Sequence, residues 1–584
     1  MAFESFPSNR LPGPLASAVN RFLQIDRLEQ LYARASAAEG FVRRLLEDLQ
    51  IHIDVTESDL DRIPKTGPVV AVSNHPSGIL DGVLLADLLT RVRPDVRILT
   101  NQLLGELPEL ARLCIFIDPF DRPESRVANG RALKEAVRHL RAGGMLAIFP
   151  AGEVSHFDIR KRAICDPAWN VTAARLIRMT HAKSLPILIR GANGIPFQVL
   201  GMVHPRLRTA ALPAEMLNKR GKRVAIRIGS TIDPARIAAL PGDAEATNYL
   251  RLRTELLERR GRLEPHASTD KTEIAPEVSR DALAGELALL PALCRVESTR
   301  EYEVILAEAR YIPLALAEIG RLREITFRAA GEGTREPRDL DRFDAHYLHL
   351  FLWNKEKREI VGAYRLGEVQ KIVARFGPKG LYTESLFRFQ WGFLSRLGPS
   401  LELGRSFIRP EYQKQFAPLL LLWKGIGAFV SRHPQYSMLI GAVSVSNQYS
   451  PASRELIARY FETQGAAGAW NGAVRARRPL RSNLVQKWET AALCALLPDM
   501  EDLSAPISDL EPDGKGVPIL VKQYVKLGGK LLAFSVDPQF GNTLDGFVMV
   551  DLTSTSPEIL SRYMGKAEAQ AFFVWHRTPR PRVA

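Results

Sequence analysis

The feature that most constrains the fold of this chain is an alternation of short apolar runs with helical stretches. One polar segment interrupts this alternation. Between residues 68 and 232, the runs PVVAVS, VRILT, CIFID, MLAIF, LPILI and VAIRIG alternate with stretches of helical periodicity such as RALKEAVRHLRAGG. This order predicts an α/β domain with a mostly parallel sheet. Residues 262–280 are polar and aperiodic, which predicts a linker.

A second alternation follows that segment. AEIGRLREITFRAAGEG predicts a helix and a turn, and LHLFLWN, EIVGAYRL and SLELGRSFI predict strands. PLLLLWKGIGAFVSRH then predicts a helix and MLIGAVSVS a strand. Because 584 residues are too many for one hydrophobic core, we predict two α/β domains, residues 1–261 and 281–584.

Residues 1–50 include a segment with apolar side chains at helical spacing and Arg and Glu between them. This amphipathic pattern has two interpretations, a helical pair packed on the first domain or a helix lying in the lipid interface. We expect neither a secretory leader nor a spanning helix. Lys424 interrupts the most apolar stretch, residues 416–430, which is typical of a buried globular helix.

The net charge of +14 predicts an anionic partner, which leaves nucleic acid, an anionic membrane leaflet or a small acidic protein. The chain has no helix-turn-helix, zinc or RNA-binding signature, so we expect no nucleic-acid partner. Cys114, Cys165, Cys294 and Cys494 are far apart, which predicts neither disulfides nor a metal site.

The segment AVSNHPSGILDGVLL places Asn74, His75 and Asp81 where a strand gives way to a helix. Ligands usually bind at the carboxyl ends of strands in open α/β sheets. Removal of a proton from a hydroxyl needs a base, and a neutral histidine is suitable near pH 7. A carboxylate can hold the imidazole in the useful tautomer, which is the role expected of Asp81.

Asn-His-Pro-x-Gly-x-x-Asp-Gly resembles the block I motif of the glycerolipid acyltransferases, the lysophosphatidic acid acyltransferase superfamily. The family motif has four residues between His and Asp, whereas this chain has five between His75 and Asp81. Gly78 is expected to absorb the additional residue, because glycine accepts positive φ. The longer spacing is similar to that of the hemolysin-like acyltransferases.

Three later segments resemble the remaining blocks in order, over about residues 40–240. They are CIFIDPFDR with Arg122, FPAGEVS with Gly152 and Glu153, and LPILI with Pro186. The resemblance implies O-acylation with His75 and Asp81 as catalytic residues. It implies that the substrate is bound by Asn74, Arg122, Gly152, Glu153 and Pro186. Blocks II and III depart from the family pattern, so the glycerol-phosphate acceptor stays in question, and Arg122 is a candidate contact for a carboxylate.

The second half carries a series of arginines and acids: Arg323, Asp339, Asp341, Asp344, Arg365, Glu402 and Arg405. Their order resembles the acyl-homoserine lactone synthases and, more closely, the lyso-ornithine lipid N-acyltransferases. Both have the GCN5-related N-acetyltransferase (GNAT) fold. The resemblance covers about residues 315–450.

N-acylation of an amino acid requires that its amine lose a proton, and Glu402 is the predicted catalytic carboxylate. Asp341 and Asp344 are predicted to bind a cationic side chain, and Arg323, Arg365 and Arg405 the α-carboxylate. The alternatives are that the aspartates cap turns and that Glu402 pairs with Arg405.

The glycine-rich pyrophosphate loop of ordinary GNAT enzymes is absent after Ile408. This favours acyl carrier protein as the donor, with acyl-CoA as the alternative, and a basic surface suits that acidic protein. We expect no cofactor and no metal.

The two halves together resemble the bifunctional ornithine lipid synthases. The resemblance implies N-acylation of ornithine by a 3-hydroxyacyl chain, followed by O-acylation of lyso-ornithine lipid. It also implies a bacterial enzyme on the cytoplasmic side of the inner membrane, bound peripherally. Fusion would raise the effective concentration of the intermediate.

Three alternatives stay open at this point. The same two steps could act on glycine, lysine or glutamine. The first domain could instead be a lysophospholipid acyltransferase fused to an unrelated N-acyltransferase. The third is a non-enzymatic, hemolysin-like membrane protein.

Overall fold

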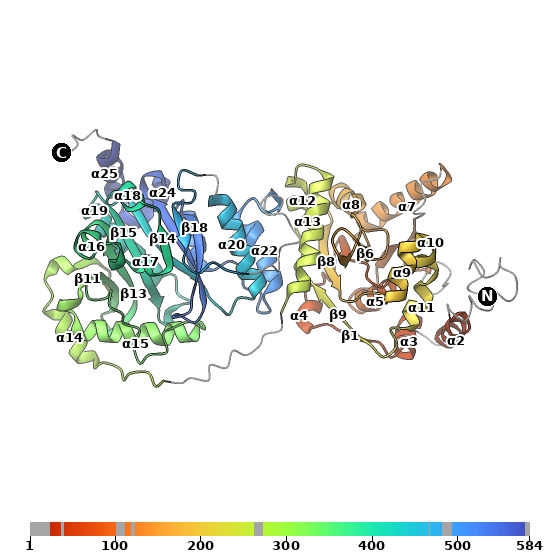
Figure 1. Ribbon diagram of the computed structural model, residues 1–584, viewed down its shortest axis with the longest axis horizontal. Helices are drawn as coiled ribbons and strands as arrows, with labels where there is room; N and C mark the ends of the chain where they lie inside the picture. The colour runs from red at the N-terminus through yellow and green to blue at the C-terminus, as the bar shows by residue number, and fades with distance from the viewer. Residues whose placement is uncertain are drawn as a thin grey trace. The chain divides into compact units, whose positions relative to one another are not determined.

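The computed structural model describes residues 24–36, 40–100, 111–117, 123–261, 272–465, 468–481, 493 and 495–577. The chain divides into two compact units, Met1–Arg260 and Gly261–Ala584 (Figure 1). Each unit is built around its own sheet and its own hydrophobic core. Among these residues, no helix combines the length and the apolar composition needed to cross a membrane.

Unit 1 contains a sheet of seven strands in the order β1-β9-β8-β2-β5-β3-β4. All neighbours are parallel except β8 and β9. The central strands are almost continuously apolar because both of their faces are covered. The strands are β1 (His52–Asp54), β2 (Val69–Ser73), β3 (Val96–Thr100), β4 (Cys114–Phe116), β5 (Met145–Ile148), β8 (Lys183–Ile189) and β9 (Arg223–Ile228), and β6 (His156–Asp158) and β7 (Ala163–Cys165) form a separate hairpin.

Alternate residues of these strands face the two helical layers. Val69 and Ala71 belong to a core that includes α3 and α5, whereas α8 and α13 also contact β2. The helices are α2 (Ile25–Ser36), α3 (Phe41–Asp48), α4 (Glu57–Leu60), α5 (Ile79–Thr90), α7 (Pro123–Arg141), α8 (Thr172–Thr180), α9 (Ile195–Val203), α10 (Pro205–Ala210), α11 (Leu212–Leu217), α12 (Pro234–Ala239) and α13 (Asp243–Leu256).

Unit 2 contains a sheet of eight strands in the order β10-β11-β12-β13-β15-β16-β19-β18. Only β15 and β16 are parallel, and α19 connects them. The strands are β10 (Arg295–Ser298), β11 (Tyr302–Glu308), β12 (Leu348–Asn354), β13 (Glu359–Glu368), β15 (Ser400–Ile408), β16 (Met438–Val445), β18 (Lys530–Asp537) and β19 (Thr543–Asp551), and β14 (Phe387–Phe389) pairs with β17 (Val474–Ala476).

Two long helices cover opposite faces of this sheet. Ile305 and Phe351 pack in one core with residues of α15, whereas Val304 and Leu350 lie against Gly425 of α19. Successive residues of a strand point to opposite faces, so the two helices enclose the sheet between them. The helices are α14 (Arg280–Ala288), α15 (Pro313–Ala329), α16 (Val369–Phe376), α17 (Tyr382–Leu386), α18 (Phe393–Leu397), α19 (Ala417–Arg432), α20 (Pro451–Gly465), α22 (Met500–Leu510), α23 (Ile519–Lys526), α24 (Pro557–Met564) and α25 (Lys566–Arg577).

The predicted fold class is confirmed: both units are α/β, and the first sheet is mostly parallel. The stretch around Lys424 forms the buried helix α19, as predicted. Of the two interpretations of the N-terminal segment, the structure favours packing on the domain for α3, because Phe41, Leu45 and Leu46 join the unit 1 core. Of the predicted linker, residues 262–271 lie outside the described chain, residues 272–279 have no regular structure, and α14 begins at Arg280.

Candidate active sites

The first site is the turn between β2 and α5. His75 Nδ1 lies 2.9 Å from Asp81 Oδ2, and the same oxygen accepts hydrogen bonds from the backbone N–H groups of Ser77 (2.7 Å) and Gly78 (2.9 Å). Asp81 is fully buried in the first turn of α5. Because three donors converge on one oxygen, the carboxylate is held at a fixed position.

Gly78 makes this turn possible. Its φ is +82°, and a Cβ at this position would lie 2.5 Å from Leu212 Cδ2. The backbone therefore turns between His75 and Asp81, and the turn brings the Asp81 carboxylate to the imidazole. The predicted compensation for the longer spacing is confirmed: glycine accepts this φ readily, whereas other residues are strained there.

The His75 ring presents its second nitrogen for chemistry. A carboxylate only accepts, so Nδ1–H donates to Asp81 and Nε2 keeps a free lone pair. Within the described chain, no residue forms a hydrogen bond with Nε2. The ring stacks on Phe149 with a centroid distance of 4.2 Å, which fixes its plane. This geometry is suitable for a general base.

The loop after β5 supports the turn from the other side. Ser155 N donates to the His75 carbonyl oxygen (2.8 Å), and His75 N donates to Asp166 Oδ1 (3.3 Å). Asp166 also accepts from Trp169 Nε1 (3.0 Å). Asp166 was not predicted, because it lies 91 residues from His75 and follows no motif.

The other predicted residues of unit 1 are dispersed around this turn. Asn74 uses its amide on the Ile189 backbone, donating from Nδ2 (2.9 Å) and accepting at Oδ1 (2.8 Å), so it joins β2 to β8. Pro186 is buried within β8, opposite Val72. Asn74 and Pro186 thus contact the protein itself, and their substrate-binding roles stay predictions.

Gly152 and Glu153 lie in the loop that follows β5. Gly152 has a φ of +69°, and Glu153 is exposed and pairs with Arg208 of α10 (2.6 Å). Their predicted contacts with a substrate stay predictions. Arg122, the predicted anion contact, lies outside the described residues.

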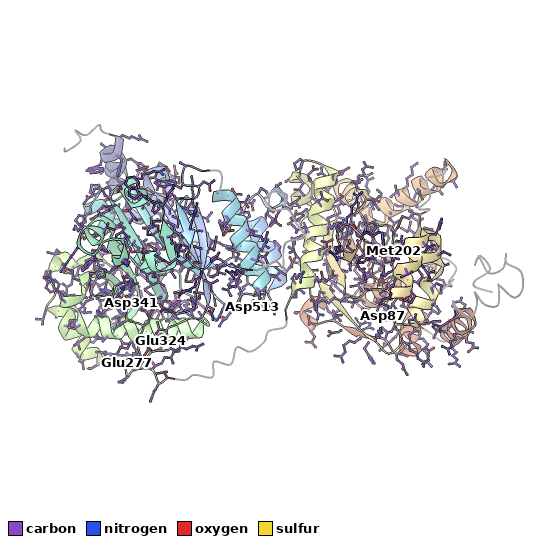
Figure 2. All side chains as sticks on the ribbon, viewed as in Figure 1. Asp87, Met202, Glu277, Glu324, Asp341 and Asp513 are labelled. Atoms are coloured by element: carbon purple, nitrogen blue, oxygen red, sulfur yellow. The ribbon has the colours of Figure 1, made fainter. Side chains whose placement is uncertain are left out.

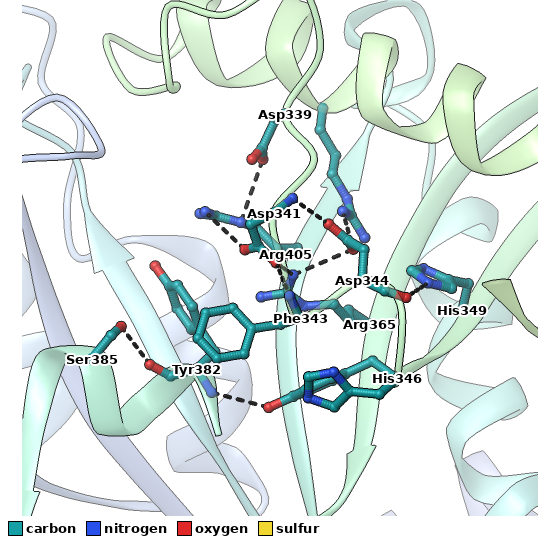
Figure 3. Close-up of polar contacts among 12 residues, drawn as sticks. Asp339, Asp341, Phe343, Asp344, His346, His349, Arg365, Tyr382, Ser385 and Arg405 are labelled. Carbon is teal, nitrogen blue, oxygen red and sulfur yellow. Dashed lines mark hydrogen bonds and ion pairs between the residues drawn. The ribbon is translucent and has the colours of Figure 1, made fainter. Parts of the chain in front are cut away.

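The second site centres on a network of arginines and aspartates between α15, β13 and β15 (Figure 3). Asp344 Oδ1 lies 2.9 Å from Arg323 Nη1 and 3.3 Å from Arg365 Nη1. Asp341 Oδ1 lies 2.6 Å from Arg365 Nη1. The side chains of Arg323 and Arg365 are almost completely buried, so they need these partners to offset the lost hydration.

Arg405 completes the network from β15. Its Nε lies 3.4 Å from Asp339 Oδ2, and its Nη2 lies 3.7 Å from Asp341 Oδ2. Its guanidinium lies 4.5 Å from the Phe540 ring centroid and 4.9 Å from that of Tyr382. The predicted residues therefore come together, but the aspartates bind arginines of the protein in this structure.

Burial and the charges in the network shift the pKa values of several side chains. Burial acts to raise the pKa of Asp344, but Arg323 and Arg365 hold it below the ordinary value. Burial raises the pKa of Asp339 above the ordinary value, although the arginines oppose this. Burial and the charge of Arg323 lower the pKa of His349 to about 4, so this ring is neutral near pH 7.

Glu402 lies beside this network but outside it. It is buried in β15, accepts a hydrogen bond from Tyr347 Oη, and accepts another from Thr383 N (2.6 Å). The alternative of an ion pair between Glu402 and Arg405 is wrong, because Arg405 pairs with Asp339 and Asp341. These contacts favour a positioning role, and the catalytic role of Glu402 stays a prediction.

The strands β15 and β16 separate beside Arg405. They pair from Ser400–Met438 to Leu403–Gly441, and β15 continues to Ile408 and β16 to Val445 without further pairing to each other within the described chain. Arg405 has a φ of +48°, where the register between β13 and β15 shifts. The separated strands present backbone N–H and C=O groups that an extended, amide-containing chain can bind.

Three acids near Arg405, namely Glu332, Asp537 and Asp545, were not predicted as a group. Burial raises the pKa of Glu332 to about 8, with the charge of Asp545 adding to the shift. Burial also raises the pKa of Asp545 to about 6, against hydrogen bonds such as that from Ser444 Oγ (2.6 Å). Asp537 Oδ2 accepts from Tyr382 Oη (3.3 Å). Within the described chain, the Glu332 carboxylate has no hydrogen bond or ion pair.

Sequence patterns gave no signal for Glu332, which follows α15 in a glycine-containing turn. Asp537 and Phe540 both lie near the site, since Asp537 contacts Tyr382 and the Phe540 ring lies beside the Arg405 guanidinium. Asp551 instead accepts from Thr553 N (2.9 Å) and caps a turn.

Two family models match the chain. Residues 43–261 match the model described as an acyltransferase. Residues 322–424 match the model described as an acetyltransferase (GNAT) domain. The two matched segments fall in the two units, and they contain the His75 and Arg405 sites respectively.

Named relatives resemble parts of this chain. A glycine N(alpha)-acyltransferase of Phocaeicola vulgatus is 31% identical over 46% of this chain and 85% of that protein. An L-ornithine N(alpha)-acyltransferase of Agrobacterium fabrum is 27% identical over 42% of this chain and 78% of that protein. A lyso-glycine lipid O-acyltransferase of Phocaeicola vulgatus is 30% identical over 33% of this chain and 68% of that protein.

Proposed function

Because this chain belongs to the acyltransferases, with an acyltransferase domain followed by a GNAT domain of the kind found in amino-acid N-acyltransferases, we propose that it builds a diacylated aminolipid from ornithine. Unit 2 acylates the α-amine of ornithine, and unit 1 then acylates the hydroxyl of the attached chain. The observation that carries the proposal is the presence, in one chain, of a His–Asp base and a separate GNAT site.

In unit 1, the His75–Asp81 pair supports O-acylation. The hydroxyl oxygen of the lyso-lipid attacks the thioester carbon while His75 Nε2 takes the hydroxyl proton. The ester C–O bond forms, the C–S bond breaks, and the proton passes to the leaving thiolate. Asp81 stabilises the imidazolium that forms between these steps.

In unit 2, we propose that the thioester arm lies between the separated ends of β15 and β16. The amine nitrogen attacks the thioester carbon, the amide C–N bond forms, the C–S bond breaks, and the proton taken from the amine passes to the leaving thiolate. Glu332 is suitable for taking the amine proton, because its carboxylate has no hydrogen-bond or ion-pair partner among the described residues and its pKa is raised to about 8. Arg405 is the arginine placed to contact the α-carboxylate, since Arg323 and Arg365 are more deeply buried.

The acids around Asp545 support a cationic acceptor. The charge of Asp545 raises the pKa of Glu332, and the charge of Asp537 raises the pKa of Asp545. An ammonium group placed beside them would relieve this repulsion. Glycine has no second amine to fill such a position, so ornithine is the acceptor we propose over glycine.

For the donor, we propose acyl carrier protein. The segment after Ile408 continues through a short 3-10 turn, Pro410–Tyr412, to α19, in place of a glycine-rich pyrophosphate loop. The basic chain is suited to an acidic carrier protein. We propose that the enzyme acts peripherally at the cytoplasmic side of the inner membrane.

The test is expression of the chain in a host without aminolipids, followed by mass spectrometry of the lipid extract. We expect a lipid that fragments to ornithine with one amide-linked and one ester-linked chain. The His75→Ala variant should accumulate the one-chain lipid, because only the second step needs the base. Altered phospholipid chains without an aminolipid would instead support the lysophospholipid acyltransferase alternative.

Glycine is the second candidate acceptor, which a relative at 31% identity favours. The same extract distinguishes the two acceptors by head group. The Asp545→Asn variant adds a second criterion: it should weaken acylation of ornithine and leave acylation of glycine little changed. Equal losses for both amino acids would contradict the role of Asp545 in binding a side-chain amine.

A further inference from the structure

Helix α9 in unit 1 is apolar on its outer face. It contains no charged residue, and its exposed side chains are spaced i, i+4, i+7 and i+8: Ile195, Val199, Met202 and Val203. Ile195 is 79% and Val203 71% exposed. At this spacing the four side chains form one stripe. The opposite face is already occupied, because Phe197 is buried in a cluster with Val154 and Leu212.

The β6–β7 hairpin extends this apolar surface. Phe157 N of the hairpin donates to Gln198 Oε1 of α9 (2.9 Å), so the two elements are attached. Ile159, at the hairpin tip, is 71% exposed, and the exposed residues Arg160, Lys161 and Arg162 follow it directly. Asp158 accepts from Arg160 N (2.8 Å) and Lys161 N (3.1 Å), and its Oδ2 lies 4.0 Å from Lys161 Nζ, so the hairpin tip carries one acid beside three cations.

We propose that the α9 patch (Ile195, Val199, Met202, Val203, Phe157 and Ile159) inserts into an anionic lipid surface. Large exposed apolar patches mark interaction sites, and this one is bordered by consecutive cations. Apolar side chains enter the acyl boundary of a bilayer, while Arg and Lys contact anionic headgroups. The charge of the hairpin tip selects an anionic membrane over an apolar protein partner.

The patch lies close to the His75 turn. Phe197 of α9 packs with Val154 and Ile79. Val154 precedes Ser155, which donates to the His75 carbonyl oxygen, and Ile79 follows Gly78 in the same turn. If the proposed function holds, docking here would bring a membrane-bound lyso-lipid to the base. The docking itself is independent of that function.

The experiment measures sedimentation of the full chain with vesicles, in the absence of substrates. Vesicles of phosphatidylcholine alone are compared with vesicles that also contain phosphatidylglycerol. We expect stronger binding to the anionic vesicles. Met202→Gln should weaken binding about tenfold, because a buried Met side chain stabilises insertion. Lys161→Glu should weaken binding only to the anionic vesicles, by at least about fivefold.

Met179→Gln is the matched control. Met179 is 57% exposed and Met202, labelled in Figure 2, is 55% exposed, but Met179 lies on α8, which packs against α12 and α13. This variant should bind vesicles like the unchanged chain. Hydrogen exchange should show new protection of residues 195–203 and 156–165 with vesicles.

Several outcomes would overturn the proposal. Equal losses for Met202→Gln and Met179→Gln would exclude a specific patch. Protection of residues 195–203 without vesicles would mean that another part of the chain covers the patch. A dimer that Met202→Gln converts to a monomer would mean that a second copy covers it. Vesicle binding with no aminolipid product would refute the proposed function and leave the docking intact.

Discussion

Individual side chains in this protein depend on the backbone that holds them. Asp81 reaches His75 only because Gly78 adopts a φ of +82° and donates its N–H to Asp81 Oδ2. Glu332 illustrates the opposite case, a carboxylate whose environment disfavours its charge, with a pKa of about 8. Substitutions at Gly78 and Glu332 can test these two effects, the turn conformation and the raised pKa.

Gly78→Ala should destabilise unit 1 more than Gly67→Ala. Both glycines have φ near +83°, so each substitution costs roughly 1–3 kcal/mol of backbone strain. Only at Gly78 does the added Cβ also contact Leu212 Cδ2, at 2.5 Å, and overpacking costs roughly 1–3 kcal/mol more. Thermal unfolding of the two variants measures the difference. Equal losses would show that Leu212 moves aside freely.

Glu332→Gln should change stability only above about pH 4.5, the ordinary pKa of this carboxyl. The ordinary pKa of this carboxyl is 4.5, and burial raises it to about 8 in the folded chain. The unfolded chain therefore loses the proton first, so stability falls as the pH rises from about 4.5 to about 8. Removing the carboxylate should raise the melting temperature near pH 9 and leave it unchanged near pH 4. If the melting temperatures of the variant and the unchanged chain differ by the same amount near pH 4 and near pH 9, the raised pKa is contradicted.

At the scale of elements, the arginine–aspartate network joins α15, β13 and β15 to the loop that precedes β12. Arg323 comes from the helix, Arg365 and Arg405 from the strands, and their acidic partners from the loop. The network lies where β15 begins to separate from β16. It therefore stabilises the sheet at the point where strand pairing is lost.

Asp344→Asn should strongly destabilise unit 2. The substitution removes the carboxylate that the buried Arg323 and Arg365 share. Breaking a buried ion pair costs about 3–5 kcal/mol. Asp281→Asn is the matched control, because the Asp281–Arg358 pair is exposed and worth about 0–1 kcal/mol. Chemical unfolding gives both values. A small loss at Asp344 would mean that water replaces its carboxylate.

For the whole molecule, each hydrophobic cluster of the described residues lies within one unit. The core around β2 and α5 consists of residues of unit 1, and the core between α15 and the second sheet consists of residues of unit 2. Each family model also falls within one unit. Each unit is therefore expected to fold without the other.

Residues 1–261 and 272–584, expressed as separate chains in one host, should still make the aminolipid. The one-chain intermediate should accumulate relative to the fused chain, because separation removes the effective concentration that fusion provides. The ratio of one-chain to two-chain lipid in the extract measures this effect. An unchanged ratio would mean that the intermediate exchanges freely through the membrane.

Much of this protein could be predicted from local sequence. Strands alternating with helices identified two α/β units because periodicity reports which face of an element is buried. The spacing around Gly78 predicted the His75–Asp81 contact, since six residues of chain leave few ways to close that turn. Both resemblances, to an acyltransferase and to a GNAT domain, are confirmed by the family models.

Only the tertiary structure decided which charges meet and which surfaces stay open. Asp341 and Asp344 were predicted to bind substrate, but packing brings them against Arg323 and Arg365. Glu332, Asp545 and Asp166 reach their sites across long stretches of chain, and α9 is apolar on both faces, so no local pattern shows which face is exposed. The reason is physical: periodicity encodes whether a side chain is buried, whereas its partner depends on how distant elements pack.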